Sequence, residues 1–182
     1  MLKPFHQITV PDERHRWFSH PETLEPITLE LHYQDVERIT LSEAVPPDVV
    51  EAFDRSRNAF VYAWFVYELL ALAHMQAYAS LELALRKRFG IPSGKNAPSL
   101  SRLLQRAVTE KLVVDPQAHH KGGIASFVSS IRNMWGHGTN TLLDPGQTID
   151  ALRMTANIIN RLFSDEAAGP SRGFTGSPGP GH

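Results

Sequence analysis

The sequence of 182 residues contains no cysteine, so no disulfide supports the fold. It also lacks the run of about 20 apolar residues that a membrane span needs. The richest apolar stretch, residues 59–75, is interrupted by Glu68 and His74. The first residues lack the apolar core and the small-residue cleavage site of a signal peptide. These absences predict a cytoplasmic protein that does not bind a membrane.

The net charge is also small, at −1, which argues against a nonspecific nucleic-acid binder. The average hides an asymmetry, because residues 1–55 hold eleven acidic and five basic side chains, whereas residues 86–137 hold nine basic and two acidic ones. Residues 86–137 thus have a net charge of +7. Either these charges lie on solvated helix faces, or they bind an anionic ligand such as RNA. For an RNA ligand, we assign the phosphate contacts to Arg102, Arg106 and Lys121.

The N-terminal part of the chain has a pattern that is typical of strands. Residues 27–33 and 36–41 alternate apolar and polar side chains, contain many β-branched residues and are separated by Gln34 and Asp35. This pattern predicts a short β-hairpin within an N-terminal extension, residues 1–47.

Beyond this extension the spacing becomes helical. Apolar side chains at three- and four-residue intervals predict a long helix at about 49–89, which Gly90 and Pro92 end. The tail, residues 165–182, is rich in glycine, proline and serine, and we expect it to be disordered. Further helices are predicted at 99–113, near 124–137 and at about 146–163. The fold class is therefore mainly α, with a helical bundle over residues 48–164.

Three chemically competent side chains, Arg132, Asn133 and His137, lie in the segment SIRNMWGHGTN. A histidine can exchange a proton with a ribose 2′-hydroxyl or a 5′-oxygen, and an arginine can stabilise phosphate charge. On an ideal helix Arg132 and His137 diverge by about 140°. Gly136 and Gly138 can loosen the helix end and let His137 turn, and a second copy of the helix across a dimer axis can supply the missing partner. The plainer interpretation is that His137 contacts exposed carbonyls at a helix end while Arg132 is solvated.

The order of LELALRKRFG, SLSRLLQRA and SIRNMWGHG resembles the HEPN superfamily over about residues 50–163. The hallmark of that family is an arginine, a polar residue, three to five further residues and a histidine, which Arg132-Asn133-x-x-x-His137 matches. The resemblance implies an up-and-down four-helix bundle that forms a homodimer. It also implies a metal-independent endoribonuclease of toxin, phage-defence or stress type, with Arg132, Asn133 and His137 as catalytic residues. RNA is then the substrate, an antitoxin or other regulatory protein is a further partner, and no cofactor is needed.

Several alternatives stay open. Some members of the family do not cleave RNA, so a non-catalytic module that binds a nucleotide or a protein is the second interpretation. Glu82 either reaches Arg132 and holds its guanidinium in place or is the i+4 partner of Arg86. The N-terminal extension has no counterpart in the minimal bundle and can act as a lid, a dimerisation arm or an antitoxin-binding surface. His74 is expected in the core, and no metal site is expected, since cysteine and His-Glu-x-x-His patterns are absent.

Overall fold

A computed structural model describes residues 2–19, 24–92, 94, 97–115, 119, 121–126, 128, 130 and 143–164. Within these ranges no strand occurs apart from an isolated bridge between Ser19 and Pro26. The predicted helical class is therefore confirmed. The elements are the 3-10 helices η1 (Phe5–Gln7) and η2 (Glu13–Trp17) and the α-helices α1 (Leu29–Glu37), α2 (Pro47–Tyr62), α3 (Leu69–Phe89), α4 (Leu100–Thr109) and α6 (Pro145–Leu162).

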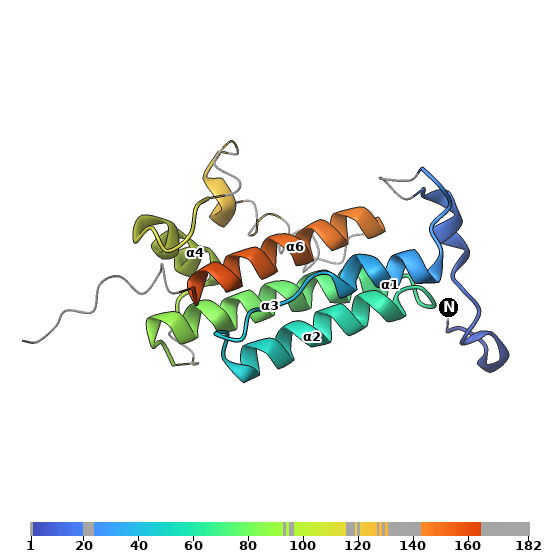
Figure 1. The fold of residues 1–182 in the computed structure, drawn as a ribbon, viewed down its shortest axis with the longest axis horizontal. Helices are drawn as coiled ribbons and strands as arrows, with labels where there is room; N and C mark the ends of the chain where they lie inside the picture. Colours follow the sequence, from blue (N-terminus) through green and yellow to red (C-terminus); the bar gives the residue numbers. More distant parts are fainter. Residues whose placement is uncertain are drawn as a thin grey trace, which may run out of the picture.

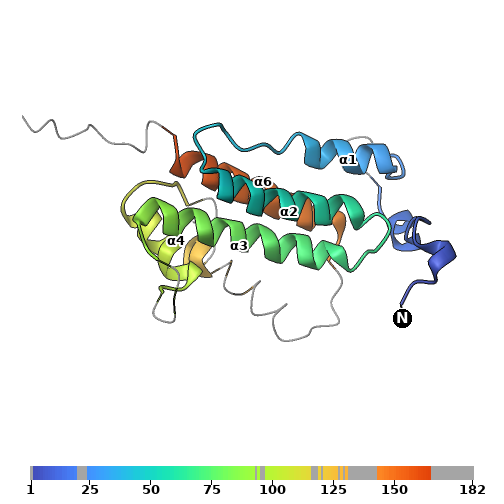
Figure 2. The same ribbon diagram turned by 90° about the horizontal axis from the view of Figure 1, so that it is seen from below.

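The long helices lie side by side along one axis (Figures 1 and 2). α2 and α3 pack against each other as an antiparallel pair, and α6 packs against α3 in the same direction as α3. α1 contacts α2 and α6, while α4 contacts α3. Figure 1 places α4 at one end of the bundle and η1 and η2 at the other. Among the described helices, none is long and apolar enough to cross a membrane.

Local sequence explains the ends of these helices. Gly90 adopts a left-handed φ of 64° at the C-terminus of α3, as predicted. The Ile91 N–H donates to the Arg86 carbonyl at 2.9 Å, and the Gly90 N–H donates to the Lys87 carbonyl at 3.2 Å, so the last turn is capped. α6 begins with Pro145 in its first turn, after Asp144, whose carboxylate accepts the Gln147 N–H at 2.8 Å.

A single hydrophobic cluster joins α1, α2, α3, α4 and α6. α4 contributes the apolar face that its sequence spacing predicts, since Leu100, Leu103, Leu104 and Ala107 are all buried. The largest side chains with almost no exposed surface are Phe53, Phe60, Leu70, Leu81, Leu85, Leu103, Leu104, Ile124, Leu152, Ile159, Leu162 and His32.

The predicted β-hairpin is wrong, because residues 29–37 form α1. Thr28 caps this helix by accepting the Leu31 N–H at 3.2 Å. The residues that α1 buries are His32 and Val36, four positions apart, while Tyr33 is 47% exposed. The two-residue alternation predicts that His32 faces solvent, whereas in the structure its ring faces the core.

The single helix predicted at 49–89 is also wrong, since residues 63–68 reverse the chain between α2 and α3. Trp64 and Tyr67 are buried within this reversal, so their apolar character reflects a packed turn and not a continuing helix face. The predicted disordered tail, residues 165–182, lies outside the described residues. The division of the chain at residue 48 stays a prediction.

Candidate functional site

The three predicted catalytic residues, Arg132, Asn133 and His137, lie outside the described residues. Their roles therefore stay predictions. The structure does describe the start of the segment that leads to them and the basic side chains on α4, and these two features define the candidate site.

Two glycines and an aspartate determine how the segment begins. Gly122 and Gly123 have positive φ angles of 85° and 60°, which favour glycine. The Asp115 carboxylate accepts the Ile124 N–H, with oxygens at 3.0 and 3.2 Å from the nitrogen. A Cβ atom on Gly123 would lie 2.0 Å from Asp115 Oδ2, so only glycine lets the carboxylate approach this closely. Asp115 thus caps the helical residues 123–126.

Apolar side chains then attach this segment to the bundle. Ile124 and Val128 are each 1% exposed and belong to the same hydrophobic cluster as Leu103 and Leu104 of α4. Figures 1 and 2 both place residues 123–126 beside α4. Ile124 and Val128 therefore attach the described part of this segment to the α4 end of the molecule.

The basic side chains predicted to bind phosphate lie on the surface of this end. Arg102 and Arg106 are exposed and four positions apart on α4, so they share a helix face, and Lys121 is exposed before the next helical segment. The guanidinium of Arg106 lies 4.1 Å from the centre of the Phe89 ring, and its Nε donates to Glu110 at 2.6 Å. Within the described ranges Arg102 and Lys121 form no ion pair. Arg106 is therefore held in place, whereas the other two charges face solvent.

Glu82 pairs with Arg86, one turn further along α3. This is the i+4 pair that the sequence offers as the simpler role for the glutamate, and the side chains are 18% and 21% exposed. Its second predicted partner, Arg132, lies outside the described residues, so that contact stays a prediction.

His74 is 4% exposed, with its Nε2 atom 3.1 Å from the Tyr78 hydroxyl, and its predicted place in the core is confirmed. Burial lowers the pKa of His74 to about 4. The ring therefore stays neutral at physiological pH and serves packing.

Sequence reasoning missed a pair of buried titratable side chains at the N-terminal end. His15 and His32 are 2% and 1% exposed, and their ring centroids lie 5.5 Å apart. They come from η2 and α1, seventeen positions apart in the chain, so no local spacing connects them. The one sequence signal is the i, i+4 spacing of His32 and Val36, which places the histidine on the apolar face of a helix.

Among the described residues no group of three or more histidine, aspartate or glutamate side chains is arranged to hold a metal ion. Comparisons with protein family models, with curated proteins and with solved structures found no match. The functional proposal therefore depends on the residues of this chain and on the resemblance of its motif.

Proposed function

We propose that this protein is a metal-independent endoribonuclease with a HEPN-like bundle, and that RNA binds across its α4 end. The observation that carries the proposal is the exposed pair Arg102 and Arg106 on α4, beside the anchored segment that leads to Arg132. Exposed arginines and lysines attract the phosphate backbone, and a histidine and an arginine later in the chain supply the chemistry that RNA cleavage needs.

In the proposed reaction the ribose 2′-oxygen attacks the adjacent phosphorus while the bond from phosphorus to the 5′-oxygen breaks. His137 acts in proton transfer, either by taking the 2′-hydroxyl proton or by giving a proton to the leaving 5′-oxygen. Arg132 stabilises the negative charge that develops on the phosphate oxygens, and Asn133 orients the phosphate or the imidazole ring. The products are a 2′,3′-cyclic phosphate and a 5′-hydroxyl.

A homodimer is part of the proposal. Because Arg132 and His137 diverge on one straight helix, the second copy supplies the missing side chain of each site. An antitoxin or another regulatory protein is the partner expected for a ribonuclease of this kind.

The direct test is RNA cleavage in excess chelator by the unmodified protein and by the Arg132→Ala and His137→Ala variants. We expect the unmodified protein to cleave, and each variant to lose about 100-fold or more of the rate, which is the usual contribution of a positioned acid or base. Arg153→Ala and His6→Ala are controls, because neither side chain is among those assigned to RNA binding or catalysis, and both variants should leave the rate unchanged.

Equal cleavage by all variants contradicts the assigned roles, and activity that disappears with the chelator contradicts the metal-independent reaction. A folded protein that binds RNA or a nucleotide and leaves every RNA intact supports the alternative, a non-catalytic binding module.

The α4 surface is tested by binding, with His137→Ala as the background so that RNA is not consumed. Arg102→Ala and Lys121→Ala should weaken RNA binding, and each should reduce the slope of log affinity against log salt by about 1. Arg153→Ala is the control for a general loss of positive charge. An unchanged slope in the α4 variants places the RNA elsewhere.

A further inference from the structure

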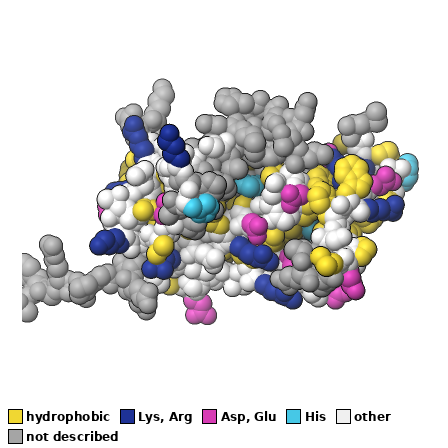
Figure 3. Space-filling view, turned by 90° about the horizontal axis from the view of Figure 1, so that it is seen from above, with side chains coloured by type: hydrophobic (Ala, Val, Ile, Leu, Met, Phe, Trp, Pro, Cys, Tyr) yellow, Lys and Arg dark blue, Asp and Glu magenta, His cyan; other side chains and the backbone are white. Residues whose placement is uncertain are grey.

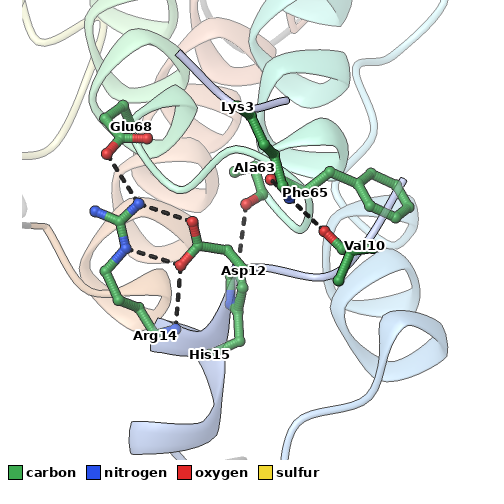
Figure 4. A network of polar contacts seen from close by, with 8 residues as sticks. All are labelled: Lys3, Val10, Asp12, Arg14, His15, Ala63, Phe65 and Glu68. Atoms are coloured by element: carbon green, nitrogen blue, oxygen red, sulfur yellow. Dashed lines mark hydrogen bonds and ion pairs between the residues drawn. The ribbon is translucent and has the colours of Figure 1, made fainter. Parts of the chain in front are cut away.

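The N-terminal segment, residues 2–19, provides hydrogen-bond donors for carbonyls in the reversal directly after α2. Buried backbone carbonyls outside regular secondary structure need donors from elsewhere in the molecule. The His15 ring lies 3.0 Å from the Ala63 carbonyl, the Asp12 N–H donates to the Trp64 carbonyl at 2.9 Å, and Lys3 Nζ donates to the Phe65 carbonyl at 2.8 Å. Figure 4 shows the contacts of His15 with Ala63 and of Lys3 with Phe65, together with the ion pairs of Arg14 with Asp12 and Glu68.

A second histidine extends this arrangement from α1. His32 Nε2 lies 2.7 Å from the Phe60 carbonyl, and its ring stacks on the Phe60 ring at a centroid distance of 4.2 Å. The His15 ring stacks on Trp64 at 4.7 Å and meets the His32 ring edge-on at 5.5 Å. Two histidines from different elements thus share one buried layer at the end of α2.

Both rings fit this layer only in the neutral state. A carbonyl oxygen can only accept, so Nε2 carries the proton in each ring and Nδ1 does not. Within the described part of the chain, His15 Nδ1 is buried and has no hydrogen-bond partner. A second proton would leave a buried N–H without an acceptor and would place two positive rings in contact.

The charged surroundings do not compensate for such a proton. The Asp12 carboxylate is already held by Arg14, whose guanidinium Nη2 lies 2.7 Å from it, and this hydrogen bond lowers the pKa of Asp12 to about 2. Burial lowers the pKa of His15, and it lowers the pKa of His32 to about 4.

The titratable and charged groups around the layer come from four parts of the chain. They are Asp12 and Arg14 from the N-terminal segment, Asp35 from α1, Tyr67 and Glu68 from the reversal after α2, and Asp144 at the start of α6, which acts on Tyr67.

We infer that residues 2–19 form an acid-released latch, which detaches from the α2–α3 reversal when His15 and His32 take up protons while the rest of the bundle stays folded. Once the latch is open, the His15 ring reaches water and recovers the ordinary histidine pKa of about 6.5, and the His32 ring loses its contact with His15 and becomes easier to protonate. The open form therefore binds more protons than the closed form below about pH 6.5, and the closed form loses stability as the pH falls from there toward 4. Trp64 and Tyr67, which the latch covers, become accessible. The inference does not depend on RNA cleavage.

Hydrogen exchange of the full-length protein tests the latch. The reporters are the amides of Asp12, which donates to the Trp64 carbonyl, and of His15, with the amides of α3 as the internal reference. After correction for the intrinsic exchange rate, protection of the latch amides should fall about fivefold between pH 6.5 and 5.5 for each proton taken up. Protection in α3 should hold over the same range. The inference is overturned if protection of the latch amides does not change with pH, or if these amides are unprotected at pH 7.5. It is also overturned if protection falls equally in the latch and in α3.

The double variant His15→Gln and His32→Gln identifies the sensing groups, because glutamine keeps an N–H donor for each carbonyl and does not titrate. Its latch protection should be independent of pH between 6.5 and 5.5. His74→Gln, which replaces a buried histidine of α3, is the control and should keep the profile of the unmodified protein. A double variant that keeps the unmodified profile overturns the assignment, and if it does not fold, the exchange profile of the unmodified protein still decides between local and global opening.

Discussion

At the scale of single residues, the contact of Gly123 with Asp115 positions the segment that leads to the predicted catalytic residues. We predict that Gly123→Ala lowers the free energy of unfolding by about 2 to 4 kcal/mol, because the new methyl group displaces the carboxylate and the backbone keeps a left-handed φ. Urea unfolding measures this change.

Gly90→Ala separates the two causes. Gly90 also has a left-handed φ, of 64°, but a Cβ atom there meets nothing within 4 Å. Gly90→Ala should therefore lower the free energy of unfolding only by the backbone strain, about 1 to 2 kcal/mol. If Gly123→Ala costs no more than Gly90→Ala, the close approach of Asp115 does not constrain the segment.

The sequence predicts residues well where burial follows from a local repeat. The buried face of α4, the cap at Gly90 and the core position of His74 all follow from spacing within one element. The burial of His15 does not, because it depends on the Ala63 carbonyl, 48 positions away. Only the three-dimensional arrangement shows that this histidine caps a helix end.

At the scale of elements, Asn160 on α6 fixes the connection between α1 and α2. Its Oδ1 accepts the Ser42 N–H at 2.8 Å, and its Nδ2 donates to the Thr40 carbonyl at 3.0 Å. We predict that Asn160→Ala is less stable than Asn157→Ala by about 1 to 2 kcal/mol, since two hydrogen bonds are lost. Chemical unfolding of the two variants checks the difference.

Asn157 is a suitable control because it is exposed on the same helix. Alanine brings the same gain in helix propensity at both positions, so that gain cancels in the comparison. Equal stability of the two variants shows that the connection between α1 and α2 does not need this amide.

Two elements show where sequence reasoning fails for a physical reason. The stretch that forms α1 alternates apolar and polar residues as a strand does, yet a capping threonine and contacts with α2 and α6 favour a helix. The stretch predicted as one helix over residues 49–89 contains two helices, α2 and α3. The chain reverses between them, because carbonyls directly after α2 find hydrogen-bond donors in a segment more than 40 positions earlier in the chain. The tendency to form a helix can be predicted from local sequence, whereas the position of a chain reversal depends on contacts with residues far away in the chain.

At the scale of the whole molecule, the two ends of the bundle differ in chemistry. The N-terminal end carries strongly exposed apolar side chains, among them Phe5 at 90% and Trp17 at 70%, and it contains the neutral histidine layer. The α4 end carries exposed arginine and lysine side chains, and Figure 3 shows dark-blue side chains distributed over that end. The latch and the basic side chains of α4 therefore lie at opposite ends of the bundle, so each can be changed without direct contact with the other.

The central claim is that RNA is cleaved through its own 2′-hydroxyl, with His137 in proton transfer. It is tested most directly with two RNA oligonucleotides of one sequence, one with ribose throughout and one with 2′-deoxyribose at the cleaved position, both in excess chelator. The account predicts that only the first is cut, that its fragments carry 2′,3′-cyclic phosphate and 5′-hydroxyl ends, and that His137→Ala slows the reaction about 100-fold or more. Cleavage of both oligonucleotides, or an unchanged rate in the His137→Ala variant, would contradict it.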